Sequence, residues 1–66
     1  MQLMINDMPQ QFAQPLSIAD LLQTLAQPQN GIAVALNQQV VSKSQWPHTQ
    51  LKDHDRITLF KVVAGG

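Results

Sequence analysis

The sequence contains no cysteine. It therefore offers no disulfide, no thiolate nucleophile and no cysteine ligand for a structural zinc ion. A chain without cysteine is compatible with a reducing compartment, and we expect a cytoplasmic protein. A Ser-His-Asp set and a phosphate-binding glycine loop are also missing. An enzyme in its own right is therefore the least favoured class, and we expect no catalytic residue.

Charge is scarce as well. Charged residues make up 12% of the chain, and four basic and four acidic residues give a formal net charge of zero. Binding along nucleic acid needs a cluster of Lys and Arg that neutralises several phosphates, and the sequence has no such cluster. The first seven residues lack the basic region of a signal peptide, and no apolar run reaches membrane-spanning length. We therefore expect neither nucleic acid nor a membrane as a partner.

The chain nevertheless has enough apolar residues for a small folded domain. Its 66 residues are 44% hydrophobic, which argues against disorder. A domain near this lower size limit buries only about 60% of the surface that its unfolded chain exposes. We expect residues 1–62 to form this single domain and residues 63–66 to form a flexible tail.

The first predicted element is a hairpin. Leu3 and Ile5 alternate with their neighbours in the period-two pattern of a half-buried strand. Residues 6–9 supply turn residues, and residues 10–14 predict a short return strand. Prolines bound this return strand, which suits an edge strand because proline cannot donate to a ladder.

A helix follows. Its apolar face has the spacing i, i+3, i+4 and i+7, and consists of Ile18, Leu21, Leu22 and Leu25. Ser17 is a good N-cap, and Asp20 three residues later approximates a capping box. Leu16 and Leu21 have the spacing of a hydrophobic staple. Pro28 prevents continuation of the helix. We interpret the apolar face as core and not as a partner-binding face.

The second half of the chain predicts further strands. Residues 32–37 form a third strand, and a short run follows at residues 40–41. Residues 44–47 predict a helical turn that Pro47 stops, with Trp46 filling the edge of the core. After a loop, residues 56–62 predict the last strand.

This order predicts an α+β fold. A hairpin, a helix and a second group of strands fit one mixed sheet of four to five strands, with one main helix packed on one face. The helix in the connection would bring the first and last strands together as parallel neighbours. That arrangement is the β-grasp, or ubiquitin-like, architecture.

The last strand has two different faces. Ile57 and Leu59 point one way and fit beneath the helix. On the other face lie Phe60 and Val62, beside Ala33 and Ala35 if the third strand is adjacent. Exposed apolar patches tend to mark sites where a partner binds. The alternative is that a loop partly covers Phe60, whose ring would then serve only in packing. We favour a docking patch because these residues lie on the strand that leads into the tail.

The tail itself consists of Val63, Ala64, Gly65 and Gly66. Fully extended, these four residues reach about 13 Å, enough to carry a terminal carboxylate into another protein's cleft. Gly65 and Gly66 lack a Cβ and so fit a narrow channel. The alternative is an ordinary frayed end, which the dipeptide taken alone would favour.

The remaining polar candidates lie in a turn and a loop. Asp53, His54 and Asp55 could suggest a metal site or an acid–base pair. Adjacent turn residues rarely converge on one ion, however, and no fourth ligand is evident. We interpret the three as a solvated turn and His48 as a surface residue, and we expect no metal site.

Four stretches of the sequence form a distinctive combination. They are residues 33–41 (AVALNQQVV), Ser44 with Trp46, residues 51–53 (LKD) with Asp55 and Ile57, and residues 63–66 (VAGG). This combination closely resembles the ThiS family, the sulfur carriers of thiamine thiazole biosynthesis, over the whole chain. Ser42 and Lys43 depart from a Pro-Arg pair that is common there. His54 stands where glycine is common, which has a cost if its φ is positive.

The resemblance implies a defined chemistry for Gly66. A ThiF-type adenylating enzyme would activate its carboxylate with ATP, the acyl-adenylate would become a thiocarboxylate, and thiazole synthase would receive the sulfur. Val63, Ala64 and Gly65 would enter the partner's active site. The chain would bind no cofactor itself, since the partner uses the ATP, and it would act as a protein co-substrate.

Three alternatives stay open at this point. A molybdopterin-type sulfur carrier or a ubiquitin-like modifier would join Gly66 to a different acceptor. A plain β-grasp interaction module would carry an inert tail.

Overall fold

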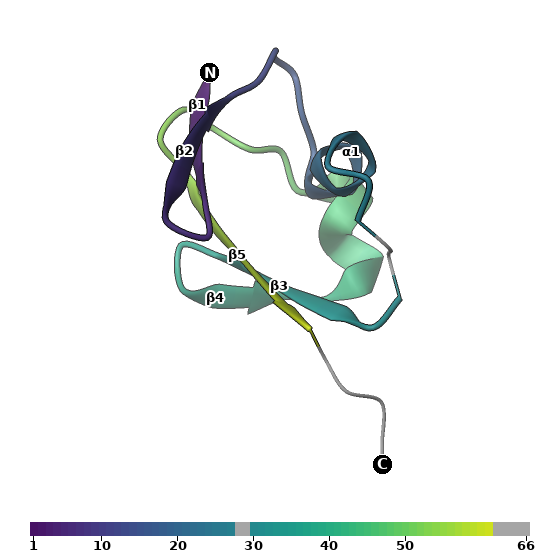
Figure 1. The fold of residues 1–66 in the computed structure, drawn as a ribbon. Coiled ribbons are helices and arrows are strands. Elements are labelled where there is room, and N and C mark those ends of the chain that lie inside the picture. The colour runs from purple at the N-terminus through teal and green to yellow at the C-terminus, as the bar shows by residue number, and fades with distance from the viewer. Residues whose placement is uncertain (28–29, 62–66) are drawn as a thin grey trace.

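The architecture is a five-stranded sheet with one main helix against one face (Figure 1). The computed structural model describes residues 1–27 and 30–61. Within these residues the elements are β1 (Gln2–Ile5), β2 (Met8–Gln11), α1 (Ile18–Thr24), β3 (Ile32–Leu36), β4 (Gln39–Val41), the 3₁₀ helix η1 (Lys43–His48) and β5 (Arg56–Lys61).

The strands lie in the order β2-β1-β5-β3-β4. β1 and β5 are parallel neighbours, and the other three pairs are antiparallel. The predicted mixed sheet, with the first and last strands side by side, is confirmed, and so is its β-grasp topology. Among the helices of the described residues, none is both long and apolar enough to cross a membrane.

The N-terminal hairpin turns earlier than predicted. Asn6 and Asp7 alone form the turn, with φ angles of 49° and 67°. Two consecutive positive φ values are what the favoured two-residue hairpin turn requires. The return strand is therefore β2, and the predicted bounds of residues 10–14 were wrong. Pro9 lies within β2, where its missing donor is tolerated because this strand is at the edge of the sheet, as predicted.

Helix α1 begins with the predicted capping box. Ser17 Oγ accepts a hydrogen bond from the N–H of Asp20 at 3.1 Å, and Asp20 Oδ2 accepts one from the N–H of Ser17 at 3.2 Å. Leu16 and Leu21, the predicted staple, are both buried in the core. The box pairs backbone donors that the first turn of a helix otherwise leaves unsatisfied.

Helix α1 ends through a capping motif and not at Pro28, which lies outside the described residues. Ala26 has a φ of 56°. Its N–H donates to the carbonyl of Gln23 at 3.1 Å, and the N–H of Gln27 donates to the carbonyl of Leu22 at 2.9 Å. This pair of bonds is a Schellman motif, whose left-handed residue is usually glycine. Ala26 therefore carries a steric penalty at its Cβ that glycine would avoid.

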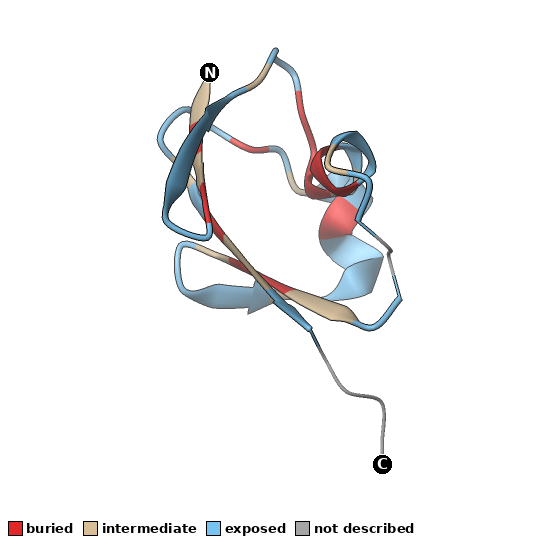
Figure 2. Ribbon diagram, viewed as in Figure 1, coloured by how far each residue is buried: buried red, intermediate tan, exposed pale blue. Residues whose placement is uncertain are grey.

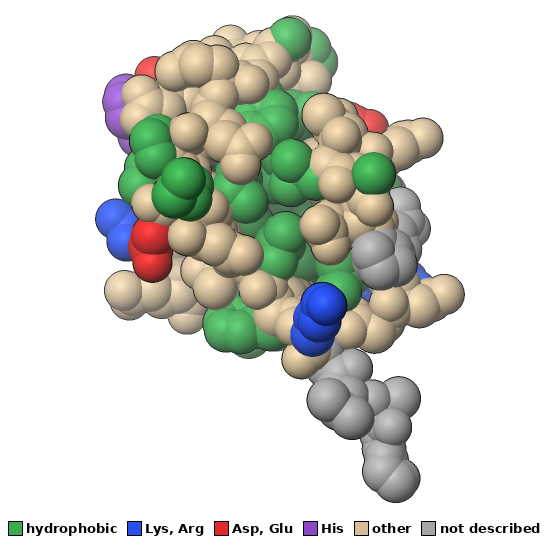
Figure 3. Space-filling view, viewed as in Figure 1, with side chains coloured by type: hydrophobic (Ala, Val, Ile, Leu, Met, Phe, Trp, Pro, Cys, Tyr) green, Lys and Arg blue, Asp and Glu red, His purple; other side chains and the backbone are tan. Residues whose placement is uncertain are grey.

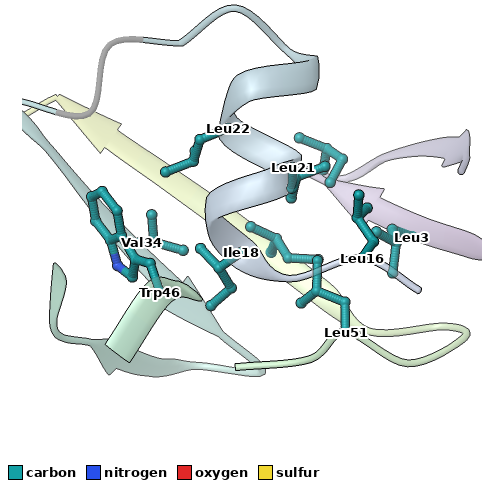
Figure 4. Close-up of a cluster of buried hydrophobic side chains, with 10 residues drawn as sticks. Leu3, Leu16, Ile18, Leu21, Leu22, Val34, Trp46 and Leu51 are labelled. Atoms are coloured by element: carbon teal, nitrogen blue, oxygen red, sulfur yellow. The ribbon is translucent and has the colours of Figure 1, made fainter. Parts of the chain in front are cut away.

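The core lies between α1 and the sheet (Figure 2). It consists of Leu3, Ile5, Leu16, Ile18, Leu21, Leu22, Val34, Trp46, Leu51 and Ile57. Figure 4 shows most of these side chains pointing toward one another from the helix, the strands and the loop after η1. In the space-filling view of Figure 3, hydrophobic side chains are visible between the β1–β2 hairpin and α1, surrounded mostly by backbone and other side chains. The helix face predicted to be core is therefore confirmed as core.

The segment after β4 closes the edge of this core. Trp46 is only 3% exposed, and its Nε1–H donates to the carbonyl of Val41 at 3.0 Å. The prediction that Trp46 fills the core edge is confirmed. The prediction that Pro47 stops the helical turn was wrong, because Pro47 lies inside η1. The N–H of Thr49 bonds to the carbonyl of Trp46, and this bond does not use the proline nitrogen.

Candidate functional site

The candidate site begins on β5, the central strand of the sheet. Its side chains alternate between the two faces as the sequence predicts. Ile57 is fully buried beneath α1 and Leu59 packs against the core from the same face. Thr58 and Phe60 point to the open face, and Phe60 is 49% exposed. No loop of residues 1–27 or 30–61 covers Phe60 completely, so about half of this residue remains available for contact with another molecule.

The neighbouring strand places small side chains beside this ring. Ala33 lies directly opposite Phe60 in the antiparallel register of β3 and β5, and Ala35 lies opposite Thr58. The predicted adjacency of these strands is confirmed. Ala35 is only 6% exposed, so it forms the floor of the surface and contributes little area. Val62, the other predicted member, lies outside the described residues.

Sequence reasoning missed one residue of this surface. Val40 of β4 lies opposite Ala35 and is 74% exposed. Val41 lies opposite the buried Val34 and is half-buried against the core, so its neighbour must face the other way. The signal was present in the two adjacent valines, but the register that orients them depends on the turn at residues 37–38. We call Ala33, Ala35, Val40, Thr58 and Phe60 the open-face patch.

Two asparagine side chains hold β5 from opposite sides. Asn6 Oδ1 accepts the N–H of Leu59 at 2.8 Å. Asn37 Oδ1 accepts the N–H of Arg56 at 3.0 Å, and its Nδ2 donates to Asp55 Oδ1 at 3.1 Å. Each asparagine is the first residue of a hairpin turn and has a positive φ. The two turns therefore fix the strand that leads to the C-terminus.

The turn at residues 53–55 is bound to the start of β1. The N–H of His54 donates to the carbonyl of Gln2 at 2.6 Å, and the N–H of Gln2 donates to Asp53 Oδ1 at 2.7 Å. This second bond lowers the pKa of the Asp53 carboxyl, and the neighbouring His54, 3.3 Å away, lowers it further. Asp55 Oδ2 accepts the N–H of Lys52 at 2.7 Å. These carboxylates thus pair with backbone groups of the turn and of β1.

His54 has a φ of 70°, which confirms that this position favours glycine. His48, the last residue of η1, is exposed, as predicted. Near the patch, Arg56 Nη1 lies 3.2 Å from Asp7 Oδ1, and both side chains are more than half exposed. Such a solvated pair contributes little to stability.

The C-terminal residues Val63, Ala64, Gly65 and Gly66 lie outside the described residues. The predictions that they enter a partner's active site and that Gly66 is modified therefore stay predictions. What the structure describes is the strand that precedes them, with the open-face patch on one side and the core on the other.

Fold and site together define a class: a ubiquitin-like β-grasp domain whose central strand leads from an exposed aromatic patch to a Gly-Gly sequence. The ThiS family model matches residues 3–66, and the chain belongs to this family. The chain is 44% identical over 66 residues to the sulfur carrier protein ThiS of Escherichia coli (strain K12), with 100% of both proteins covered.

Two solved structures from Geobacter metallireducens are also similar. The crystal structure of a thiamine biosynthesis protein (ThiS) has a TM-score of 0.89 at 29% identity, with 100% of both chains covered. The NMR solution structure of a thiamine biosynthesis protein has a TM-score of 0.82 at 28% identity, and covers 100% of this chain and 88% of that one. The resemblance noted from the sequence motifs is thereby confirmed at the level of the family.

Proposed function

We propose that this protein is a sulfur carrier of thiamine biosynthesis that carries sulfur as a thiocarboxylate on Gly66. The observation that carries this proposal is the family match, which runs through Gly66, together with the 44% identity to a sulfur carrier protein. The absence of cysteine supports it, because sulfur cannot be held here as a side-chain persulfide.

The chemistry needs two displacements at the chain end. In the first, the Gly66 carboxylate attacks the α-phosphorus of ATP, and pyrophosphate leaves. In the second, a hydrosulfide equivalent from a sulfur donor attacks the acyl carbon, and AMP leaves. The first step is needed because a free carboxylate is a poor acyl donor, whereas an acyl-adenylate has a good leaving group. The product is a thiocarboxylate, which then donates its sulfur for thiazole formation.

The catalytic groups for these steps belong to partner enzymes. A ThiF-type adenylating enzyme binds the ATP and activates Gly66, and thiazole synthase discharges the thiocarboxylate. This chain is their protein co-substrate. Val63, Ala64 and Gly65 thread the partner's active site, because small residues fit a narrow channel.

The open-face patch is the docking surface in this proposal. Phe60 is half exposed and Val40 mostly exposed, on a face that no helix of the described residues covers. A partner that buries the Phe60 ring gains apolar contact while the same strand delivers the tail to its active site.

Intact-mass measurement tests the proposal. The protein is incubated with ATP, the ThiF-type enzyme of its own organism and a sulfide source. We expect the mass to change by the replacement of one oxygen with sulfur, at Gly66. A chain that ends at Gly65 is the control and should not change. An unchanged mass of the full chain, under conditions that convert the Escherichia coli protein with its own enzyme, would favour an inert tail.

The molecule that receives the sulfur, or that is joined to Gly66, distinguishes a thiazole carrier from a molybdopterin-type carrier and from a ubiquitin-like modifier. We expect thiazole synthase to discharge the thiocarboxylate, with return of the original mass. Discharge by a molybdopterin-forming enzyme instead, or transfer of Gly66 to a lysine of another protein, would contradict service in thiazole formation.

A further inference from the structure

The central strand of the sheet is only partly paired on one side. β3 pairs with β5 from Ile57 to Lys61. On the other side, β1 pairs only with Arg56 and Ile57 and then turns away toward β2. In Figure 4 the pale purple arrow of β1 ends beside β5 before the yellow arrow of β5 does. The last part of β5 therefore has an open edge inside the sheet.

The backbone hydrogen bonds identify the groups on this edge. The carbonyls of Asp55 and Ile57 accept the N–H groups of Met4 and Asn6, both at 2.9 Å. Because backbone groups of a strand point alternately to its two neighbours, the next residues on this side are Leu59 and Lys61. Asn6 Oδ1 takes the N–H of Leu59. The carbonyl of Leu59 and the N–H of Lys61 have no partner among residues 1–27 and 30–61.

This edge lacks the proline that interrupts the outer strand β2. Exposed strand edges are usually short, or carry proline, because unpaired backbone groups attract other strands. β2 carries Pro9, and β4 is only three residues long. The inner edge at residues 59–61 is as short as β4 and ends at the charged Lys61, but it carries no proline, and it lies beside the exposed ring of Phe60.

We propose that this inner edge of β5 accepts an extended segment of the adenylating enzyme as an added strand. This inference rests on the proposed function. The five residues after Lys61 are Val, Val, Ala, Gly and Gly, and extended they reach about 16 Å. Such a sequence offers few side chains to recognise, so a partner that grips it must use main-chain hydrogen bonds. A strand placed along Leu59 and Lys61 begins that grip inside the folded domain.

Amide hydrogen exchange of the unmodified protein tests the edge directly. In the free protein, we expect the N–H of Lys61 to exchange much faster than that of Leu59, which Asn6 protects. Saturation with the adenylating enzyme and a non-hydrolysable ATP analogue should slow exchange at Lys61 by about tenfold or more. Unchanged exchange at Lys61 in the complex overturns the proposal. Protection that rises with the concentration of the carrier alone assigns the edge to a second copy, and also overturns it.

A pair of variants tests the same point by kinetics. Lys61→Pro removes the N–H and blocks a neighbouring strand, whereas Lys61→Ala removes only the side chain. We expect the two variants to have similar melting temperatures, because the Lys61 N–H has no partner among the residues that the structure describes. A markedly lower melting temperature of Lys61→Pro would show that this N–H is already paired, against the proposal.

The KM of the adenylating enzyme for the carrier should be about tenfold higher with Lys61→Pro as substrate than with Lys61→Ala. Equal KM values, with the unmodified chain still adenylated, overturn the strand-addition inference alone. If the unmodified chain is not adenylated, the proposed function fails instead, and the two failures are therefore distinguishable.

Discussion

Phe60 lies directly opposite Ala33 across the antiparallel pair of β5 and β3. The methyl group of Ala33 is too small to cover the side of the Phe60 ring that faces it on the open face. The ring is therefore accessible even though its strand is the most central of the sheet. Two predictions below follow from the way β5 and the turn before it are built, one concerns the chain end and one concerns the end of α1.

Phe60→Asp should weaken binding to the adenylating enzyme more than it destabilises the fold. We expect KM to rise by about tenfold or more, because a charge replaces an apolar contact, and the free energy of unfolding to fall by no more than about 1 kcal/mol. Met8→Asp is a matched control, since Met8 is 64% exposed but lies on the outer strand β2. Urea unfolding and steady-state kinetics measure the two effects. A collapse of stability with normal binding would instead make Phe60 a core residue.

Deletion of Gly66 should abolish adenylation while leaving the melting temperature nearly unchanged. The described core and sheet involve no residue beyond Lys61. The variant would still present a carboxylate, on Gly65, but one residue short of the position that the enzyme reaches. Pyrophosphate release, compared with that of the full chain, gives the answer. Retained adenylation would contradict the assignment of Gly66 as the reactive residue.

Ala26→Gly should stabilise the protein. Ala26 holds the left-handed position of the Schellman motif, where glycine avoids the clash of the Cβ. The gain is partly offset by the greater freedom of glycine in the unfolded chain, so we expect about 1 kcal/mol, or roughly 4–8 °C in melting temperature. Gln23→Gly, within α1, is the control and should destabilise by about 1 kcal/mol. A loss of stability in Ala26→Gly would contradict the observed helix end.

Asp53→Asn should reduce stability at neutral pH and change its dependence on acid. The folded pKa of Asp53 is lowered, chiefly by the N–H of Gln2. A lowered folded pKa means that the carboxylate stabilises the fold above its unfolded pKa and loses this effect as the pH falls through the folded pKa. Thermal unfolding of the unmodified protein and of Asp53→Asn is measured from pH 7 into the acid range. The difference between their melting temperatures should shrink at pH values below the ordinary pKa of aspartate. A difference that stays constant would contradict the lowered pKa.

The helix and the general topology were predictable because their signals are local. The capping box of Ser17 and Asp20 and the apolar spacing of α1 each lie within one stretch of chain. The two faces of β5 followed from simple alternation. The parallel pairing of the first and last strands then followed from the order of elements.

The errors arose where backbone angle or distant contacts decide the structure. Asn6 and Asp7 adopt positive φ and complete the turn by themselves, so the return strand begins at Met8, two residues sooner than the turn composition suggested. The Asn6 side chain then bonds to Leu59, which is 53 positions away, and no local pattern indicates such a contact. Val40 was missed for the same reason, because its direction depends on the register with β3.

The last strand of the sequence is the middle strand of the sheet, and this has a consequence for biosynthesis. Until β5 is made, the nascent chain holds two separate hairpins, which are marginal by themselves in water. β1 and β5 pair across most of the sequence, so the domain can close only when almost all of it has left the ribosome. A copy cut short within β5 would lack the strand that joins the two hairpins, so it would fail to fold and would present no open-face patch to a partner.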